Sequence, residues 1–352
     1  MQKISFTFAS EYCKITVIMA RLCLFVINKI MKAASGGKKM SAQIKTEKKQ
    51  KNKNSGWAYF NRHKQIYMFL LPGIILTFIF SYIPLMGLSV AFLDYDVFLG
   101  MKSPFVGFDN FAKILSMPQF TQAIWNTLKI SLLNIAIAFP LPIVFALLLN
   151  ELSAGFFKRF TQTVSYLPHF LSTIAVVGIA TTLLSNYGVI NDLRVAAGGE
   201  GTERILFLTL QKLFVPNVIT LELWKGFGWN SIIYLASISG IDAELYEAAT
   251  IDGAGKLKQS LHITVPSIMN TVIIMLILKI GSLFASNFDL IYGLQNVYID
   301  FEVISTIVYK QGITQGDYAT ATALSFMQGF ISLFLVLGSN WLSKKYNDVS
   351  II

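Results

Sequence analysis

Six long apolar stretches constrain this sequence more than any other feature. Each has roughly the 20 residues that a helix needs to cross the ~30 Å hydrocarbon core of a bilayer, where backbone polar groups must bond within the helix. The stretches cover residues 67–93, 124–150, 166–184, 218–240, 267–288 and 321–342. With 54% hydrophobic and only 14% charged residues among 352, the chain has too few charges to cover a soluble globule. We therefore expect an all-α, polytopic membrane protein with six transmembrane helices.

Lysine and arginine are distributed unevenly among the segments that connect these stretches, and their distribution predicts the orientation. Ten lie in the tail from Lys32 to Lys64, and six more follow the second, fourth and sixth stretches. The opposite side carries six. We therefore expect a multi-pass protein of the cell membrane with both termini in the cytoplasm. The formal charge of +10 then reflects this asymmetry, and no nucleic-acid partner is expected.

The first 56 residues form a separate basic tail in this prediction. Their apolar run ITVIMARLCLFVI is too short to span a bilayer and is broken by Arg21. A helix lying on the membrane surface fits this region, and so does a disordered or partly non-native start, including translation from Met40 that would exclude residues 1–39. A signal peptide fits poorly because many cations follow the run. We assign the tail no role and expect one transmembrane domain over residues 57–352.

Cysteine and histidine give no pattern typical of a metal or catalytic site. Cys13 and Cys23 both lie in the tail, and His63, His169 and His262 are scattered without a second ligand at helical spacing. No acid, base and nucleophile converge near one membrane surface, as a membrane enzyme would require. We expect neither a bound metal nor a catalytic residue in this chain.

The segment YEAATIDGAGKLKQSLHITVP, residues 246–266, interrupts the apolar sequence between the fourth and fifth stretches. Alanine, glutamate and leucine favour a helix that Gly253 and Gly255 would end, because glycine tolerates a left-handed turn. A second short helix is expected after the turn, with Pro266 at the start of the fifth transmembrane helix. An ordinary solvated loop is one interpretation of residues 241–266. A helix, a turn and a helix that dock onto another protein is the other.

This segment resembles the EAA loop of the permease subunits of binding-protein-dependent ABC importers. The residues at the motif's positions are Glu247, Ala248, Ala249, Asp252, Gly253, Ala254, Ile263 and Pro266. Valine replaces the usual leucine before the proline, which conserves apolar packing. The Asp-Gly-Ala variant looks like the carbohydrate branch, and the sequences at 166–172 and 316–345 resemble oligosaccharide and polysaccharide permeases of Gram-positive bacteria. The likeness covers residues 57–350.

The resemblance implies the type I ABC importer permease fold and a function in oligosaccharide import. In that family the EAA loop is a coupling helix that inserts into a groove of a cytoplasmic ATP-binding subunit. Glu247 is then the candidate ion-pair partner of a basic residue there, and Ala248, Ala249 and Gly253 form the close-packing surface. The implied partners are a second homologous permease, two copies of the ATP-binding subunit, and a lipid-anchored or soluble extracellular sugar-binding protein.

The resemblance also places ATP and Mg²⁺ on the partner ATPase subunits, with no cofactor bound by this chain. The sequence DGAGK at residues 252–256 superficially suggests a phosphate-binding loop. Such a loop needs an additional glycine five residues before its Gly-Lys and a serine or threonine after it. Thr250 and Leu257 occupy those two positions. We therefore expect ATP hydrolysis on another polypeptide.

Polar and aromatic residues of the fourth and fifth stretches predict a substrate path. Lys279, about twelve residues into the fifth stretch, is expected near the bilayer midplane from the helix rise. It would meet the carboxylate of an acidic sugar, an acid of a partner subunit or a backbone carbonyl. Aromatic faces stack on sugar rings and amides bond hydroxyls, although packing and interface anchoring also explain such residues. These further candidates are Trp229, Asn230, Tyr234 and Asn287.

Other classes of transport protein remain as alternatives at this stage. A permease for peptides or amino acids would share the coupling loop. An ion-driven secondary transporter would need acids near the midplane. No Asp or Glu lies deep in the first, second, third, fifth or sixth stretch. In the fourth stretch we expect Glu222 near the outer end, paired with Lys225 on the same helix face.

Overall fold

The structure, a computed structural model, describes residues 64–153, 155–198, 203–285 and 287–347. These residues are helical apart from loops and a single antiparallel bridge between Leu93 and Phe105, which confirms the all-α prediction for this part of the chain. The predicted tail at residues 1–56 lies outside the described residues. Contacts divide the described chain into two units, one with residues 118–307 and 328 onward, the other with residues up to 117 and 308–327.

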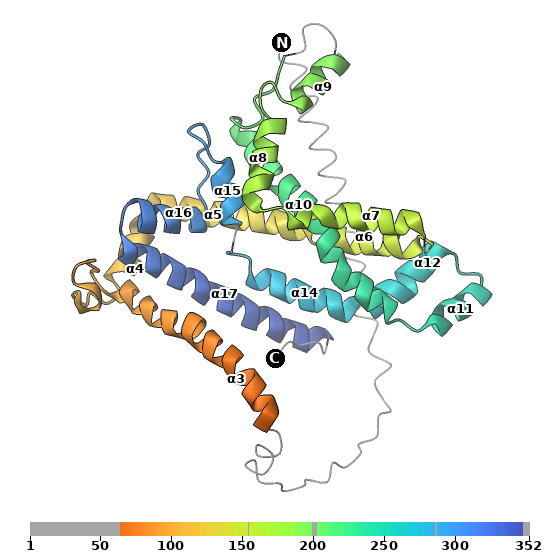
Figure 1. The fold of residues 1–352 in the computed structure, drawn as a ribbon, viewed down its shortest axis with the longest axis horizontal. Coiled ribbons are helices and arrows are strands. Elements are labelled where there is room, and N and C mark those ends of the chain that lie inside the picture. Colours follow the sequence, from red (N-terminus) through yellow and green to blue (C-terminus); the bar gives the residue numbers. More distant parts are fainter. Residues whose placement is uncertain (1–63, 154, 199–202, 286, 348–352) are drawn as a thin grey trace. The chain divides into compact units, whose positions relative to one another are not determined.

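The larger unit is organised around two long helices (Figure 1). One runs over 34 residues through α5 (Pro118–Leu133), the π-helical turn η4 (Asn134–Ala138) and α6 (Pro140–Glu151). The other is α10 (Gln211–Ser239), which packs along α6. α10 also approaches α7 (Phe156–Tyr166) closely, because a Cβ at Gly228 would lie 2.1 Å from the Ser165 carbonyl oxygen. This crossing therefore requires glycine.

Two apolar clusters lie at opposite ends of α10. The first joins residues of α5, α8 (Thr173–Leu183), the start of α10 and α15 (Phe288–Leu294), among them Ile130, Val218 and Ile291. The second joins α6, the end of α10 and the start of α14 (Met269–Gly281), among them Ile143 and Ile238. The middle of α10, which carries Glu222, lies between the two clusters along the helix.

Two of the predicted transmembrane stretches are not single helices. The stretch expected at residues 166–184 is divided between η5 (Leu167–Phe170) and α8, with a bend of 102°. A new helix begins after the bend because the Ser172 hydroxyl caps α8 by accepting a hydrogen bond from the Ala175 N–H. In the stretch expected at 267–288, α14 ends at Gly281 and α15 begins only at Phe288, and α14 is bent by 60° from the preceding helical segment.

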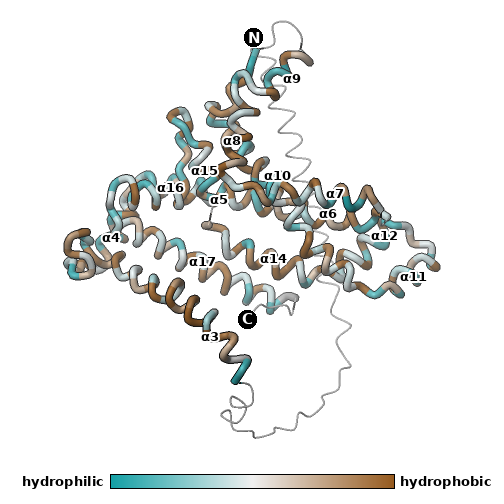
Figure 2. Tube along the Cα trace, in the orientation of Figure 1, coloured by the Kyte–Doolittle hydropathy of each residue, from teal (hydrophilic) through white to brown (hydrophobic). Residues whose placement is uncertain are grey.

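The smaller unit contains a continuous helical run and two short helices. The run comprises α3 (Lys64–Thr77), the π-helical η1 (Phe78–Tyr82) and the 3₁₀-helical η2 (Ile83–Phe92). The others are η3 (Gly100–Lys102) and α4 (Asp109–Ser116), and residues 308–327 add η7 (Lys310–Thr314) and the first part of α17 (Tyr318–Asn347). Phe92, Phe111 and Phe326 pack their rings together here. Figure 2 shows the apolar character of α3, whose large side chains are mostly exposed, as expected of a helix facing lipid or a partner.

Three helices of the described chain are long and apolar enough to cross a membrane, at Met68–Phe92, Pro118–Glu151 and Tyr318–Lys345. The number rises to five if each bent pair is one span. α10 has 29 residues but falls short of that apolarity, since it carries Glu222, Lys225 and several amide and indole groups. Six spans and cytoplasmic termini therefore remain predictions.

The remaining helices are short. α9 (Val189–Gly198) follows α8, and α16 (Ile304–Tyr309) follows α15. Residues between α10 and α14 form α11 (Ala243–Ile251), α12 (Lys256–Gln259), the π-helical η6 (Ser260–Thr264) and α13 (Val265–Ser267). We refer to residues 241–266 as the elbow. Pro266 lies within its second helical segment, three residues before α14 begins, rather than at the start of the fifth transmembrane helix as predicted.

Candidate functional site

The first half of the elbow is a capped helix with a glycine turn. The Asp242 carboxylate accepts a hydrogen bond from the Glu244 N–H at 3.0 Å and caps α11. At the other end, Gly253 has a φ of +75° and donates to the Thr250 carbonyl oxygen, while the Ala254 N–H donates to Ala249. This pair of bonds is a Schellman motif, which explains glycine at this position of the motif.

The second half of the elbow folds back and is bonded to the first. The Tyr246 hydroxyl lies 2.8 Å from the hydroxyl of Thr264, and the Gln259 amide donates to the Thr250 hydroxyl and to the Ala254 carbonyl oxygen. Gln259 is only 6% exposed and Thr264 only 1%. No sequence motif marks Gln259 or Thr264, since an isolated glutamine or threonine carries no motif signal. Together they make the elbow one rigid hairpin of helices.

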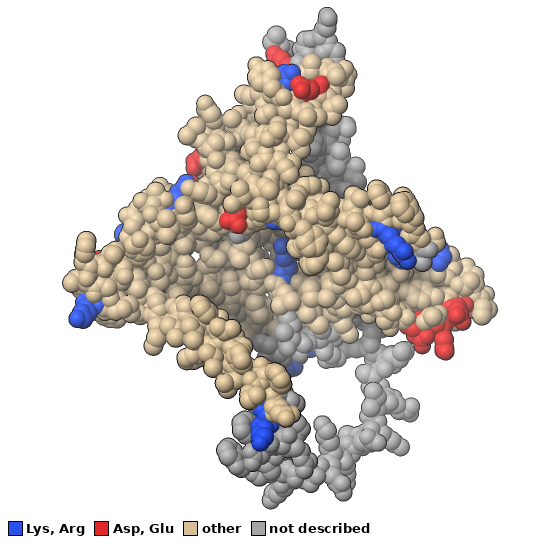
Figure 3. All heavy atoms as spheres, viewed as in Figure 1, with Lys and Arg blue, Asp and Glu red and all other residues tan. Residues whose placement is uncertain are grey.

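The outer surface of the elbow presents both acidic and apolar side chains. Glu247 and Ala248 are exposed on α11, and Ala249 is half-buried. Ile251 is 87% exposed and Leu257 75% exposed. Figure 3 shows the acidic side chains gathered over α11. Exposed apolar side chains of this size, next to a charge, are typical of a surface that binds another protein.

The other motif residues occupy the turn and the return helix. Asp252 is the exposed C-cap of α11, and Gly253 and Ala254 continue the turn. Ile263 is half-buried in η6, and Pro266 is exposed. The turn therefore directly follows Ala248 and Ala249 of α11, whereas Ile263 and Pro266 lie on the second segment.

The elbow is joined to the ends of α6, α10 and α14. It follows α10 directly, and Ile241 and Val265 pack against the apolar cluster shared by α6, α10 and α14. The Lys256 ammonium lies 3.7 Å from the Glu151 carboxylate at the end of α6. A displacement of the elbow would therefore move the ends of α6, α10 and α14 with it.

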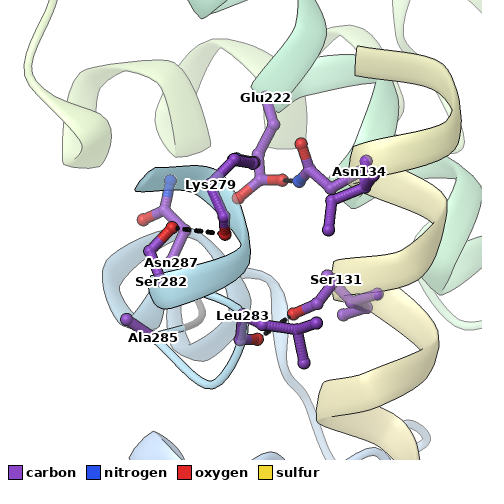
Figure 4. Close-up of a pocket in the computed structure, with 10 residues that line it drawn as sticks. Ser131, Asn134, Glu222, Lys279, Ser282, Leu283, Ala285 and Asn287 are labelled. Atoms are coloured by element: carbon purple, nitrogen blue, oxygen red, sulfur yellow. Dashed lines mark hydrogen bonds between the residues drawn. The ribbon is translucent and has the colours of Figure 1, made fainter. Parts of the chain in front are cut away.

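A polar pocket of about 230 Å³ lies between α5, α10 and the interruption that separates α14 from α15 (Figure 4). Irregular backbone is tolerated at membrane depth where it lines a polar cavity. The lining residues are Ile130, Ser131, Asn134, Ile135, Glu222, Lys279, Ser282, Leu283, Ala285 and Asn287. Half of these come from the fifth predicted stretch and the others from the second and fourth.

Hydrogen bonds fix the polar side chains around this pocket. Asn134, the first residue of the π-helical turn, donates its amide to the Glu222 carboxylate, and the Ser131 hydroxyl donates to the Leu283 carbonyl oxygen. Asn287 caps α15 by accepting from the Leu290 N–H. π-Helical turns within longer helices are frequent at functional sites.

Lys279 and Asn287, two of the five predicted substrate contacts, line this pocket together. Glu222 lines it as well, which contradicts the predicted pair with Lys225. Lys225 instead donates to the Thr173 hydroxyl at 2.8 Å. The physical reason is that packing brings Asn134 to the Glu222 carboxylate instead. Glu222 also lies well inside α10, which begins at Gln211, seven residues before the predicted stretch, rather than near its end.

The other three predicted contacts do not reach the pocket. Trp229 stacks on His169 with ring centroids 4.4 Å apart, and Asn230 is exposed. Tyr234 is only 3% exposed and belongs to the apolar cluster of α6, α10 and α14. In this conformation Tyr234 packs the core, which is the alternative role that the sequence left open for it.

No group of three or more histidine, cysteine or acidic residues that would hold a metal ion occurs among the described residues. The sequence DGAGK forms the glycine turn of the elbow and leads into α12, which has only four residues.

Comparison with known proteins identifies the family. Residues 138–347 match the binding-protein-dependent transport system inner membrane component family. The chain belongs to this family of permeases. This permease is 41% identical to the polygalacturonan/rhamnogalacturonan transport system permease protein YteP of Bacillus subtilis, over 82% of this chain and 91% of that protein. It is 38% identical to the protein LplB of the same organism, over 84% of this chain and 94% of LplB.

The permease is also similar to solved structures. It superposes on a chain of a bacterial ABC transporter involved in the import of the acidic polysaccharide alginate with a TM-score of 0.75 and 36% identity, covering 83% of this chain and 99% of the other. The similarity confirms the ABC importer permease fold. YteP and the alginate transporter are named for transport, and this chain, as a member of the same family, is a transport subunit rather than an enzyme.

Proposed function

We propose that this permease is a membrane subunit of an ABC importer that carries oligosaccharides across the cell membrane. The observation that carries the proposal is the elbow, a rigid hairpin that exposes Glu247 and Ala248 next to apolar side chains. Similarity supports the cargo class, since relatives include permeases named for arabinooligosaccharides, polygalacturonan and rhamnogalacturonan. A permease for peptides or amino acids has no comparable support.

The elbow docks into a groove of the ATP-binding subunit in this proposal. Glu247 pairs with a basic residue of that groove, and Ala248, Ala249 and Gly253 allow close approach of its backbone. Two copies of the ATP-binding subunit hold ATP and Mg²⁺. The permease itself supplies no group to ATP hydrolysis. Closure of the ATPase pair on ATP displaces the elbow and the attached ends of α6, α10 and α14. ATP drives the switch by favouring one of the two conformations.

The polar pocket forms part of the saccharide path. Lys279 lies roughly 15 Å along α14 from its first residue at 1.5 Å per residue, which is about half of a ~30 Å bilayer core. Asn134 and Asn287 offer amides to sugar hydroxyls in this interior position. Discontinuous helices commonly form substrate sites of transporters near the midplane.

The complete importer in this proposal contains a second, homologous permease and an extracellular sugar-binding protein. The solved alginate importer was also crystallised with a periplasmic protein that carries an alginate pentasaccharide. The exposed apolar side chains of α3 suit a face that contacts lipid or the second permease. Both termini of this chain face the cytoplasm, as the distribution of its lysines and arginines favours.

Reconstitution tests the proposal. The importer is assembled in proteoliposomes with its second permease and ATPase, and labelled pectic and neutral oligosaccharides are offered with the sugar-binding protein outside. We expect uptake that requires both ATP inside and the binding protein outside. Uptake of a peptide panel in place of every saccharide would contradict the assigned cargo.

A further inference from the structure

The polar pocket contains one acid and one base of the same chain. Glu222 reaches it from α10 and Lys279 from the last turn of α14, and Figure 4 shows the Lys279 side chain extending toward the Glu222 carboxylate. Lys279 attracts this carboxylate electrostatically, and the Asn134 and Asn287 side chains also interact with it. Glu222 and Lys279 are the only charged residues among the ten that line the pocket. These two side chains are of opposite charge type.

The size of the pocket restricts what it can hold. Its volume of about 230 Å³ is below the ~300–1,000 Å³ typical of pockets that enclose a drug-sized ligand. A single sugar ring suits this volume better than a longer saccharide does. An importer of oligosaccharides would therefore pass its cargo through this pocket one sugar residue at a time.

The polar groups of the pocket match hydroxyl groups. A carboxylate only accepts hydrogen bonds, an ammonium only donates them, and an amide does both. A sugar hydroxyl donates and accepts, so it can bridge Glu222 and Lys279 without leaving either charge unpartnered. The pocket therefore binds an uncharged sugar ring while Glu222 and Lys279 both keep a hydrogen-bond partner.

The carboxylate of an acidic sugar meets opposing forces in the same place. Lys279 attracts it and Glu222 repels it, and because both charges line one small pocket the two effects largely cancel. The loss of the carboxylate's hydration then has no compensation. Without the negative charge of Glu222, the attraction by Lys279 would act alone.

We propose that Glu222 is a specificity-determining residue that neutralises Lys279, so that the pocket selects an uncharged sugar residue over one that carries a carboxylate. The inference rests on the proposed oligosaccharide import. It gives Lys279 a partner acid within its own chain, in place of an acid from a partner subunit.

The test uses two probes that differ only in charge. These are trigalacturonate and its fully methyl-esterified form, each offered to the complete importer in proteoliposomes. The ratio of acid to ester uptake is divided by the wild-type ratio, so that the preference of the sugar-binding protein cancels. We expect Glu222→Gln to raise this ratio about tenfold, which corresponds to ~1.4 kcal/mol. Lys279→Gln should lower it, and the double variant Glu222→Gln/Lys279→Gln should return it toward the wild-type value.

Lys225→Gln is the matched control, because Lys225 lies one turn from Glu222 on α10 but bonds Thr173. Its ratio should stay at the wild-type value. An unchanged ratio in Glu222→Gln and Lys279→Gln, with uptake preserved, would overturn the charge-selection role while leaving oligosaccharide import intact. If Glu222→Gln fails to assemble, Lys279→Gln decides the question alone. A wild-type importer that transports no saccharide presented by its binding protein would instead refute the proposed function.

Discussion

The elbow and the polar pocket are built in opposite ways. The elbow takes all of its residues from one continuous segment of 26 residues, 241–266, and its face is exposed. The pocket takes its residues from the helix formed by α5 and η4, from α10, and from α14 with the interruption that follows it, and these segments lie far apart in the sequence. A site made by one segment is specified by local spacing, whereas a site made by three helices depends on how they pack.

This difference predicts different consequences of mutation. Changes in the elbow should impair transport of every saccharide equally, because they act on coupling to ATP hydrolysis. Changes in the pocket should alter the preference among saccharides, while the sugar-binding protein should still stimulate ATP hydrolysis. The following predictions test this separation, in order of decreasing expected effect.

Reversal of the charge at Glu247 should have the largest effect. We expect Glu247→Arg to reduce ATP hydrolysis stimulated by the sugar-binding protein by about 30-fold or more, since breaking one buried charge pair at an interface costs ~2–5 kcal/mol. The ratio of acid to ester uptake should not change. Glu244→Arg, another acid exposed on α11 one turn earlier, is the control and should retain most of the stimulation.

Substitution of Gly253 should have the next largest effect. Its φ of +75° is unfavourable for a side chain by roughly 1–2 kcal/mol, although a Cβ there has open space around it. We expect Gly253→Ala to lower the stimulated hydrolysis several-fold by straining the turn. Gly255→Ala is the matched control, because Gly255 has a φ of −69° and equally open surroundings. Equal losses in both variants would show that the left-handed turn is not what matters.

Loss of the internal bond of the elbow should have a smaller effect. Tyr246→Phe removes the hydroxyl that lies 2.8 Å from Thr264 and leaves a buried hydroxyl without this partner. Such a loss costs about 1–3 kcal/mol of local stability. We expect the number of ATP molecules hydrolysed per saccharide imported to rise about two- to fivefold, because a looser elbow transmits less of its displacement. A normal ratio in this variant would contradict the rigid-hairpin account.

Loss of the ion pair between Lys113 and Asp317 in the smaller unit should have the smallest effect, because this pair belongs to neither the elbow nor the pocket. Burial raises the pKa of Asp317, but hydrogen bonds from Lys113 and Thr320 outweigh it, so the net pKa is below the ordinary 3.8. A lowered pKa stabilises the fold above pH 3.8 and the contribution is lost as pH falls through the lowered value. Because the Lys113 side chain is half exposed, the contribution is at most a few tenths of a kcal/mol.

We therefore expect Asp317→Asn to flatten slightly the acid side of the thermal-stability profile of the purified permease, measured between pH 3 and pH 5. Transport and its saccharide preference near neutral pH should be unaffected. A clear change in saccharide preference would show that this pair belongs to the path after all.

The sequence predicted the elbow better than it predicted the pocket. The helix, the glycine turn and the returning helix follow from local preferences of residues such as Gly253, and the family resemblance rested on the same segment. The bend before α8 and the interruption after Gly281 were missed, because the apolar runs continue through both and hydropathy does not register a capping serine or asparagine.

Packing between helices determines the contacts of Glu222 and Tyr234 that residue spacing did not predict. Glu222 was expected to pair with Lys225 because three residues separate them on one helix, but α5 and α14 bring Asn134 and Lys279 to the same carboxylate instead. Nothing in the spacing of Tyr234 distinguishes a residue of the apolar cluster from one that faces a cavity. Both outcomes depend on neighbouring helices.

The most direct test of the account measures whether the elbow is gripped by the ATP-binding subunit. Cysteine is introduced as Ala248→Cys in a chain whose two native cysteines, Cys13 and Cys23, are replaced by serine, and its reaction rate with a bulky maleimide is followed. Phe98→Cys, at a side chain 98% exposed in the smaller unit, reports general accessibility. The account predicts that Cys at 248 reacts readily in the isolated permease and is protected in the assembled importer. Equal labelling in both states, with the complex intact, would contradict it.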